Sequence, residues 1–224
     1  MPLTVGPSAP IHTFKRRGGR ITGGQADARA RLWPAYGVEV DVDGPVLDLE
    51  SLFGRRAPVV LEIGFGMGEA TAAMAAAQPE IDVLAVDVHT PGQGALLRLV
   101  EWEALTNVRV ADGDALALLD HQLGDGSLAE VRAFFPDPWP KRRHWKRRLV
   151  GPRFAALVAQ RLAPGGRLHV ATDWPHYAEQ VRRVLAASEV FDLDQPVPWR
   201  AQTRFEAQAV AAGRAVHDVV ALRR

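Results

Sequence analysis

Short apolar runs alternate along most of the chain with longer segments whose apolar residues recur at helical spacing. The run from Pro58 to Ile63 is rich in β-branched residues and predicts a buried strand. The alanine-rich segment that follows, from Glu69 to Gln78, predicts a helix that ends before Pro79. The same reasoning predicts six further strands, at residues 81–87, 107–111, 129–135, 167–172, 190–193 and 215–222.

Helices are predicted between most of these strands, at residues 94–105, 114–123, 152–162 and 174–187, with a weaker one at 25–32 that ends before Pro34. Strands and helices that alternate at this spacing indicate βαβ units and a mostly parallel sheet with helices on both faces. Ligands of such sheets bind at the carboxyl ends of the strands. The residues that follow each strand are therefore the candidates for a site.

Composition narrows the class of protein. The chain has 224 residues, of which 47% are hydrophobic and 24% charged, as expected of a globular domain with a substantial core. It has no cysteine, which excludes disulfides, thiol nucleophiles and cysteine-built metal sites. It shows neither a secretory signal nor an apolar stretch long enough to span a membrane, so a cytoplasmic protein is expected.

The charges are unevenly distributed, although the formal net charge is only +1. Between Lys141 and Arg148, six of eight residues are basic, and Trp145 lies among them. A solvated surface is one interpretation of such a run. A partner that carries many phosphates is favoured because a second basic stretch is present and lysine and arginine release counterions from phosphates. The second stretch comprises Lys15, Arg16, Arg17 and Arg20.

Glycines and acids follow the first two predicted strands. The first strand runs into Glu62-Ile-Gly64-Phe-Gly66-Met-Gly68, and glycines at such a turn let the backbone approach a ligand closely. The spacing differs from the G-x-G-x-x-G of dinucleotide-binding folds, which disfavours NAD. Asp87 ends the second strand, where a carboxylate can accept both hydroxyls of a ribose.

Two further sets of acids are less simple to interpret. Asp112 and Asp114 follow the third strand, where an adenine would lie, but Asp114 is equally suited to cap a helix. After the fourth strand, Asp137 stands between Pro136 and Pro138 and directly precedes the basic run. Prolines restrict this loop and reduce the entropy lost on ordering it, which predicts that Asp137 is held at the edge of the sheet. A proline-stiffened surface loop without a function is the alternative.

The E-x-G-x-G-x-G loop, the acid after the second strand and the Leu-Ala-Pro-Gly-Gly turn at 162–166 resemble those of class I S-adenosylmethionine-dependent methyltransferases. The segment Phe135-Pro-Asp-Pro-Trp-Pro-Lys141 is more specific and resembles the bacterial tRNA (guanine-N7)-methyltransferase family. Four further segments stand in that family's order, at residues 12–20, 86–92, 171–174 and 203–206. The resemblance spans most of the chain.

The resemblance implies a Rossmann-like α/β fold with a mostly parallel seven-stranded sheet, helices on both faces and an antiparallel late strand. It implies a basic, partly flexible arm at residues 1–36 and a methyltransferase domain at 37–224. It also implies transfer of a methyl group from S-adenosylmethionine to N7 of a guanine in the variable loop of tRNA, giving 7-methylguanosine. The expected partner is tRNA, with no membrane and no obligate protein partner.

The resemblance also implies the roles of individual residues. The expected contacts of S-adenosylmethionine are Glu62, Gly64, Gly66, Gly68, Asp87, Asp114 and Asp137, with Asp137 also catalytic. The expected contacts of the substrate are Lys141, Asp173, Thr203, Arg204, Phe205 and Glu206. Two of these positions depart from the common family pattern, since Asp87 stands where many members have Glu and Arg204 where Lys is common.

The expected reaction needs little acid–base chemistry, because guanine N7 carries a lone pair and no proton. Orientation and exclusion of water are then the main tasks of the enzyme, and carboxylates such as Asp137 and Asp173 would accept the N1–H and N2–H donors of the base. The histidines lack a familiar ligand spacing, so no metal is expected, and His169, inside a strand, is expected to be structural. An NAD-dependent oxidoreductase, a non-catalytic RNA-binding module and a methyltransferase for another substrate remain the alternatives.

Overall fold

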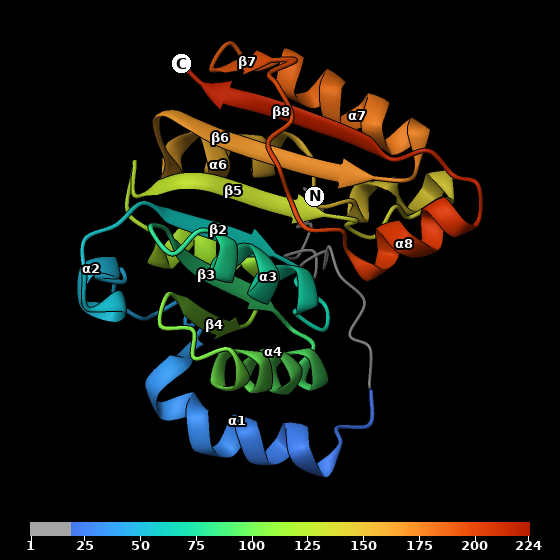
Figure 1. Cartoon of the computed structure of the whole chain (residues 1–224). Coiled ribbons are helices and arrows are strands. Elements are labelled where there is room, and N and C mark those ends of the chain that lie inside the picture. The colour runs from blue at the N-terminus through green and yellow to red at the C-terminus, as the bar shows by residue number, and fades with distance from the viewer. Residues whose placement is uncertain (1–18) are drawn as a thin grey trace, which may run out of the picture.

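The structure is a computed structural model that describes residues 19–224. Its centre is an eight-stranded sheet in the order β1-β4-β3-β2-β5-β6-β8-β7 (Figure 1). The first six strands in this order are mutually parallel, and β8 runs antiparallel to β6 and β7. The strands are β1 (Gly37–Glu39), β2 (Val59–Ile63), β3 (Asp82–Asp87), β4 (Val108–Asp112), β5 (Leu128–Phe134), β6 (Leu162–Thr172), β7 (Phe191–Leu193) and β8 (His217–Arg223).

All seven predicted strands are present, and β1 adds one strand at the edge of the sheet. The structure confirms the mostly parallel sheet and the late antiparallel strand. The extra strand has only three residues, which is too short for an alternating pattern to be visible in the sequence. It begins at Gly37, where a Cβ atom would lie 2.2 Å from the indole of Trp33. Glycine therefore allows the chain to turn directly from the preceding helix into this strand.

Helices cover both faces of the sheet (Figure 1). Apolar residues of α2, α6 and α7 form one core layer with β2, β5 and β6, and residues of α1, α3 and α4 form a second layer with β3 and β4. A 3₁₀ helix at Arg142–Arg147 and a π-helical turn at Leu118–Gln122 complete the structure. The α-helices are α1 (Gly23–Tyr36), α2 (Leu49–Phe53), α3 (Glu69–Ala77), α4 (Thr90–Trp102), α5 (Ala115–Ala117), α6 (Pro152–Arg161), α7 (Pro175–Ala186) and α8 (Arg204–Ala211).

The prediction that the first helix ends before Pro34 is wrong, because α1 continues through Pro34 to Tyr36. Proline removes one hydrogen bond there, but it lies in the last turn, and the helix is supported elsewhere. The side chains of Thr22 and Gln25 form a reciprocal capping box at its start, and Arg31 binds Glu101 of α4. Thus part of the predicted N-terminal arm packs against the sheet domain, while residues 1–18 lie outside the described part of the chain.

The carboxyl ends of the central strands meet at one edge of the sheet. The register pairs Asp87 of β3 with Asp112 of β4, and Phe134 of β5 with Ala171 of β6. The arrowheads of these strands point to the same side in Figure 1, where α8 also lies. Within residues 19–224, no helix has the length and apolar character needed to cross a membrane.

Candidate active site

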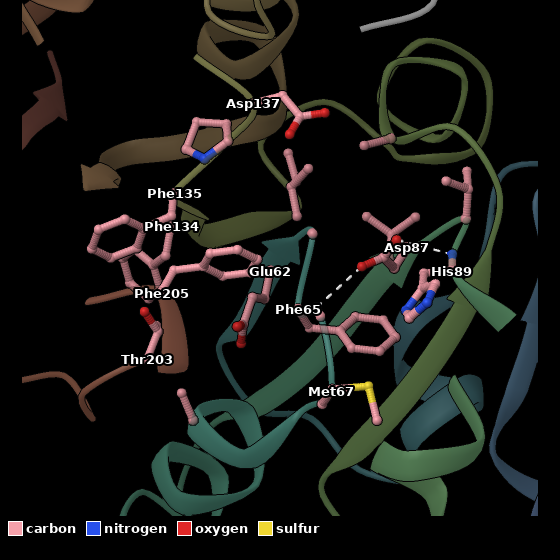
Figure 2. A pocket seen from close by; sticks show the side chains of 18 of the residues that line it. Glu62, Phe65, Met67, Asp87, His89, Phe134, Phe135, Asp137, Thr203 and Phe205 are labelled. Atoms are coloured by element: carbon pink, nitrogen blue, oxygen red, sulfur yellow. Dashed lines mark hydrogen bonds between the residues drawn. The ribbon is translucent and has the colours of Figure 1, made fainter. Parts of the chain in front are cut away.

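A cavity of about 550 Å³ opens at this edge of the sheet (Figure 2). Its walls come from the loop after β2, the ends of β3 and β5, the start of α5 and the first turns of α8. Figure 2 shows Phe134 and Phe205 on one side of the cavity and Asp87 and His89 on the other, with Glu62 between them. The cavity is therefore built from segments that lie far apart in the sequence.

Most of the predicted site residues line this cavity, and the sheet topology brings them together as expected. The lining includes Glu62, Gly64, Gly66, Asp87, Asp114, Asp137, Thr203, Arg204 and Phe205. Four predicted residues lie outside the lining, namely Gly68, Lys141, Asp173 and Glu206.

The glycine loop after β2 depends on backbone conformations that favour glycine. Gly64, Gly66 and Gly68 all have positive φ angles, between 62° and 85°. A Cβ atom at Gly64 or Gly66 would meet nothing within 4 Å, whereas one at Gly68 would lie 2.7 Å from the Cβ of Leu96. The first two glycines therefore leave room at the cavity, and Gly68 instead permits close packing of α3 on α4.

Glu62 is the most deeply buried acid of the cavity, with 4% of the residue exposed. Its Oε1 accepts a hydrogen bond of 2.9 Å from the Thr71 hydroxyl, and its Oε2 has no partner among the described residues. Burial raises the pKa of Glu62 to about 7, although Arg132 and Thr71 act in the opposite direction. A buried carboxylate oxygen without a partner favours the binding of a ligand group that carries a positive charge.

Asp87 is held by backbone amides on both of its oxygens. Gly66 N–H donates to Oδ2 at 3.1 Å and His89 N–H donates to Oδ1 at 3.0 Å. Burial raises the pKa of Asp87, and these hydrogen bonds reduce the shift. A carboxylate has about four lone-pair sites, so each oxygen keeps capacity for one more donor.

The structure gives different surroundings to Asp112, the last residue of β4, and to Asp114, which follows that strand. Asp112 faces α1, where its Oδ2 accepts a hydrogen bond of 3.0 Å from Arg29, which also binds Gln93. Asp114 lines the cavity and at the same time caps α5, accepting from the backbone N–H of Leu116 at 3.0 Å. Asp114 therefore both caps α5 and lines the cavity.

The proline-rich loop that carries Asp137 is fixed on both sides. Phe135 and Trp139 have φ angles of 52° and 42°, a region that large side chains rarely adopt. The loop is tied to the sheet by a hydrogen bond of 2.7 Å from Phe135 N–H to Ala171 O, and Arg148 Nε donates to Pro138 O at 2.8 Å. Asp137 consequently lies at the rim of the cavity (Figure 2).

Three predicted substrate residues, Asp173, Glu206 and Lys141, do not line the cavity. Asp173 follows β6 and accepts a hydrogen bond of 2.7 Å from Arg214. Glu206, in the first turn of α8, is paired with Arg200 through both carboxylate oxygens. Lys141 is exposed directly before the 3₁₀ helix.

One member of the basic run does not belong to its exposed surface. The run from Lys141 to Arg147 contributes five exposed basic side chains, but Arg148 is only 4% exposed. Arg148 packs on the rings of Trp145 and Tyr177, with 4.9 Å from its Cζ to each ring centre. Its side chain therefore does not face solvent, and it holds the proline-rich loop through the hydrogen bond to Pro138 O.

A model of a family described as putative methyltransferases matches residues 56–219 of this chain. A tRNA (guanine-N(7)-)-methyltransferase of Streptomyces avermitilis is 54% identical over 217 residues, which cover 94% of this chain and 74% of that protein. Its counterpart in Halorhodospira halophila is 51% identical over 215 residues, which cover 93% of each protein. This chain belongs to the tRNA (guanine-N7)-methyltransferase family.

Solved structures of other methyltransferases share the fold of this family member. TrmN of Thermus thermophilus superposes with a TM-score of 0.54 at 19% identity, covering 89% of this chain and 48% of its own. Phosphoethanolamine N-methyltransferase 2 of Haemonchus contortus, in complex with S-adenosyl-L-methionine, gives 0.50 at 14% identity, covering 78% of this chain and 51% of its own. At such low identity the likeness concerns the fold alone.

Sequence reasoning on this family member missed several residues that shape the site. Phe134 and Phe135 form part of the cavity wall, although their place before the proline-rich segment was a visible signal. Thr203 was predicted as a substrate contact, but its role as the cap of α8 was missed. It accepts from Glu206 N–H at 3.1 Å, and a threonine followed by a glutamate three residues later is a known sign of a helix start. The buried arginines Arg148 and Arg200 had no such local signal.

Proposed function

We propose that this chain transfers a methyl group from S-adenosylmethionine to N7 of a guanine in the variable loop of tRNA, producing 7-methylguanosine. The observation that carries the proposal is one cavity in which acids from four neighbouring strands and the loops after them meet, with the exposed basic run immediately after the Asp137 loop. Membership of the tRNA (guanine-N7)-methyltransferase family supports the same reaction.

The cavity residues fit the groups of S-adenosylmethionine. The unpaired Oε2 of Glu62 suits an ammonium group, and the remaining lone pairs of Asp87 suit the two hydroxyls of a ribose. The open faces of Gly64 and Gly66 allow the backbone to approach such a ligand. Asp114 follows β4 and lines the cavity, so we assign it, and not Asp112, to the adenine side.

When bound, S-adenosylmethionine supplies an electrophilic methyl group on a sulfonium. Guanine N7 needs no prior deprotonation, so the residues of the chain act by positioning the base and excluding water. Asp137, held on its restrained loop at the cavity, is proposed to accept N–H donors of the guanine and to favour the positive charge that develops on the ring. Phe134 and Phe135 provide an apolar wall beside this position.

The tRNA is proposed to approach over the basic run. Lys141 stands between the Asp137 loop and the other exposed basic residues, where it suits a phosphate near the target nucleotide. Thr203, Arg204 and Phe205 approach the same cavity from α8. Asp173 is proposed to contact the substrate as well, by rearrangement of its ion pair with Arg214. Glu206 is proposed to contact the substrate while its pair with Arg200 stays in place, because each carboxylate oxygen keeps a second lone pair.

The test is to incubate the purified protein alone with an unmodified tRNA transcript and S-adenosylmethionine labelled in the methyl group, and then to digest the RNA to nucleosides. We expect the label in 7-methylguanosine. A matched transcript with adenosine in place of the variable-loop guanine should remain unlabelled. Label in another nucleoside, or at another guanine, would contradict the proposal.

No metal ion is required in the proposed reaction, because N7 is already a nucleophile. Treatment of the protein with EDTA and assay in its presence, with the tRNA refolded in monovalent salt, should leave the rate within about twofold of the untreated enzyme. A loss of activity that zinc or magnesium restores, when the metal is added in a smaller amount than the RNA, would contradict this expectation.

A further inference from the structure

Arg200 lies at the centre of a partly buried ion-pair network that joins β8 to α8. Its side chain is 9% exposed, and its guanidinium binds Asp218 through Nε at 3.0 Å and Nη2 at 3.2 Å. The same guanidinium binds Glu206 through Nη1 and Nη2. Arg200 therefore makes two bidentate carboxylate pairs at once, which is the geometry that a guanidinium fulfils and an ammonium does not.

The network continues into the sheet and reaches the wall of the cavity. His169 of β6 contacts Asp218 at 2.6 Å through its Nε2, and its ring lies edge-on to Phe134 with 5.0 Å between ring centres. Arg200 itself lies over Phe134, with its Cζ 5.3 Å from the ring centre. Because Phe134 lines the cavity, Arg200 links the cavity wall on β5 to the first turn of α8.

The helix that Arg200 binds has little other anchorage. Among the described residues of α8, only Ala209 is buried, and Phe205 and Val210 remain 46% and 56% exposed. Apolar burial thus contributes little to the orientation of this helix. Glu206 is the residue whose backbone N–H is bound by the cap Thr203, so fixing Glu206 fixes the first turn that brings Thr203 and Phe205 to the cavity.

The ionisation of Asp218 agrees with a permanent ion pair between Asp218 and Arg200. Burial alone would raise the pKa of Asp218, but hydrogen bonds from His169 and Arg200 outweigh it and lower the pKa to about 2. Without Arg200, the carboxylates of Asp218 and Glu206 would face the same space with no cation between them. The first turn of α8 would then move away from the sheet.

We propose that Arg200 is a positioning residue of the methyl-transfer reaction, which orients the first turn of α8 through Glu206 and Asp218 so that Thr203 and Phe205 meet the substrate at the cavity. Arg200 does not itself line the cavity, so it acts through these partners. This inference rests on the proposed function for its kinetic consequences, and on the ion pairs alone for its structural ones.

The test compares Arg200→Lys and Arg200→Gln with the control Arg161→Gln. Arg161 is also a buried arginine in an ion pair, with Asp125, and it binds the backbone of Leu119, but it belongs to α6 and does not line the cavity. The control should lose comparable stability and keep wild-type kinetics. In Arg200→Gln, kcat/KM for tRNA should fall by about a hundredfold, mostly through KM, while the dissociation constant of S-adenosylmethionine stays within about twofold. Arg200→Lys should lose less activity than Arg200→Gln, because lysine keeps the positive charge but lacks the planar guanidinium that binds two carboxylates.

A second measurement separates this inference from the proposed function. Amide hydrogen exchange of residues 204–211 should be faster in both Arg200 variants than in the wild type and the control, whatever the substrate of the enzyme. Unchanged exchange of α8 would overturn the inference even if 7-methylguanosine is formed. Equal kinetic losses in Arg200→Gln and Arg161→Gln, assayed where both are folded, would overturn it as well. Faster exchange in a protein that never forms 7-methylguanosine would count against the proposed function only.

Discussion

Glu62 shows how its immediate surroundings give one acidic side chain its chemistry. It lies in the middle of a fully buried strand, with one oxygen bound by Thr71 and the other unpaired. Asp87, one strand away, is also largely buried, but backbone amides bind both of its oxygens. The two acids are therefore suited to different partners, a cation for Glu62 and neutral hydroxyls for Asp87.

The raised pKa of Glu62 leads to a prediction about stability. Between about pH 4.5, the ordinary value, and about pH 7, the native protein holds a proton that the unfolded chain has released, so the free energy of unfolding falls as the pH rises. Glu62→Gln removes this dependence, and Gln keeps an oxygen for the Thr71 hydroxyl. Relative to the wild type, the variant should gain stability on the order of 3 kcal/mol between about pH 5 and about pH 8.5.

Urea unfolding of both proteins at the two pH values measures this difference directly. The variant should also bind S-adenosylmethionine more weakly, because the charge that suits an ammonium group is lost. A stability difference that stays constant with pH would show that Glu62 ionises normally in the folded protein.

Asp173 invites a second prediction at the scale of single residues, because its described partner is Arg214 and it does not line the cavity. If Asp173 also contacts the guanine, Asp173→Asn should retain S-adenosylmethionine binding but lower kcat for tRNA by about a hundredfold. Arg214→Gln removes the same ion pair and serves as the matched control, with an expected loss below about threefold. Similar rates in the two variants would restrict Asp173 to its pair with Arg214.

Secondary structure elements were predictable where composition or spacing gave a local signal. The strand β2 follows from a β-branched apolar run, α3 from its alanines, α4 from apolar residues at helical spacing and α6 from a proline at its first turn. The structure adds β1, α2 and α8, which are short or bury few side chains, so no periodic pattern marks them. The acids at the strand ends were predictable because parallel topology brings them to one edge. The ion partners of these acids, such as Arg29 for Asp112 and Arg214 for Asp173, come from distant segments, and no local pattern encodes such a pairing.

Packing between two elements leads to a prediction about Gly92, in the first turn of α4. A Cβ atom at Gly92 would lie 1.9 Å from the carbonyl oxygen of Gly66, which is backbone and cannot rotate away. Gly92→Ala should therefore displace the glycine loop, lower the melting temperature and weaken S-adenosylmethionine binding by at least about tenfold. Calorimetric titration and thermal unfolding measure both effects.

Gly23→Ala is the control for this change, since Gly23 is also helical but a Cβ atom there would meet nothing within 4 Å. It should leave binding unchanged and leave stability equal to or slightly above that of the wild type. Wild-type affinity in Gly92→Ala would mean that the loop adjusts without cost.

The conformation of the loop that carries Asp137 should depend on Arg148, which is hydrogen-bonded to this loop. Arg148 donates to Pro138 O and also to Gln180 of α7. Arg148→Lys keeps the charge but cannot make both contacts with the same geometry, so kcat should fall by about tenfold with little change in S-adenosylmethionine affinity. Gln180→Ala removes one of the contacts of Arg148 with α7 and a hydrogen bond to Val150 O, but it leaves the bond of Arg148 to Pro138 O, so it should have a smaller effect. If both variants have wild-type kcat, the prolines alone are sufficient to hold Asp137.

At the scale of the whole molecule, the position of the charges matters more than their sum. The net charge of +1 predicts no strong attraction to RNA, yet five exposed basic side chains stand together beside the Asp137 loop. The loop before β2 lies at the amino ends of the strands, which is the opposite edge of the sheet. Phosphates drawn to the basic run are thus brought to the cavity, whereas phosphates drawn to the opposite edge are not.

This arrangement predicts how salt affects tRNA binding by two variants with the same change in charge. Lys146 is exposed within the basic run, and Arg56 is exposed in the loop before β2. If Lys146 contacts a phosphate, Lys146→Ala should reduce the slope of log K against log salt by about one, because one fewer counterion is released on binding. Arg56→Ala should leave the slope unchanged, although it alters the net charge equally. Equal slopes in the two variants, measured by filter binding from about 50 to 200 mM salt, would mean that tRNA responds to net charge and not to this surface.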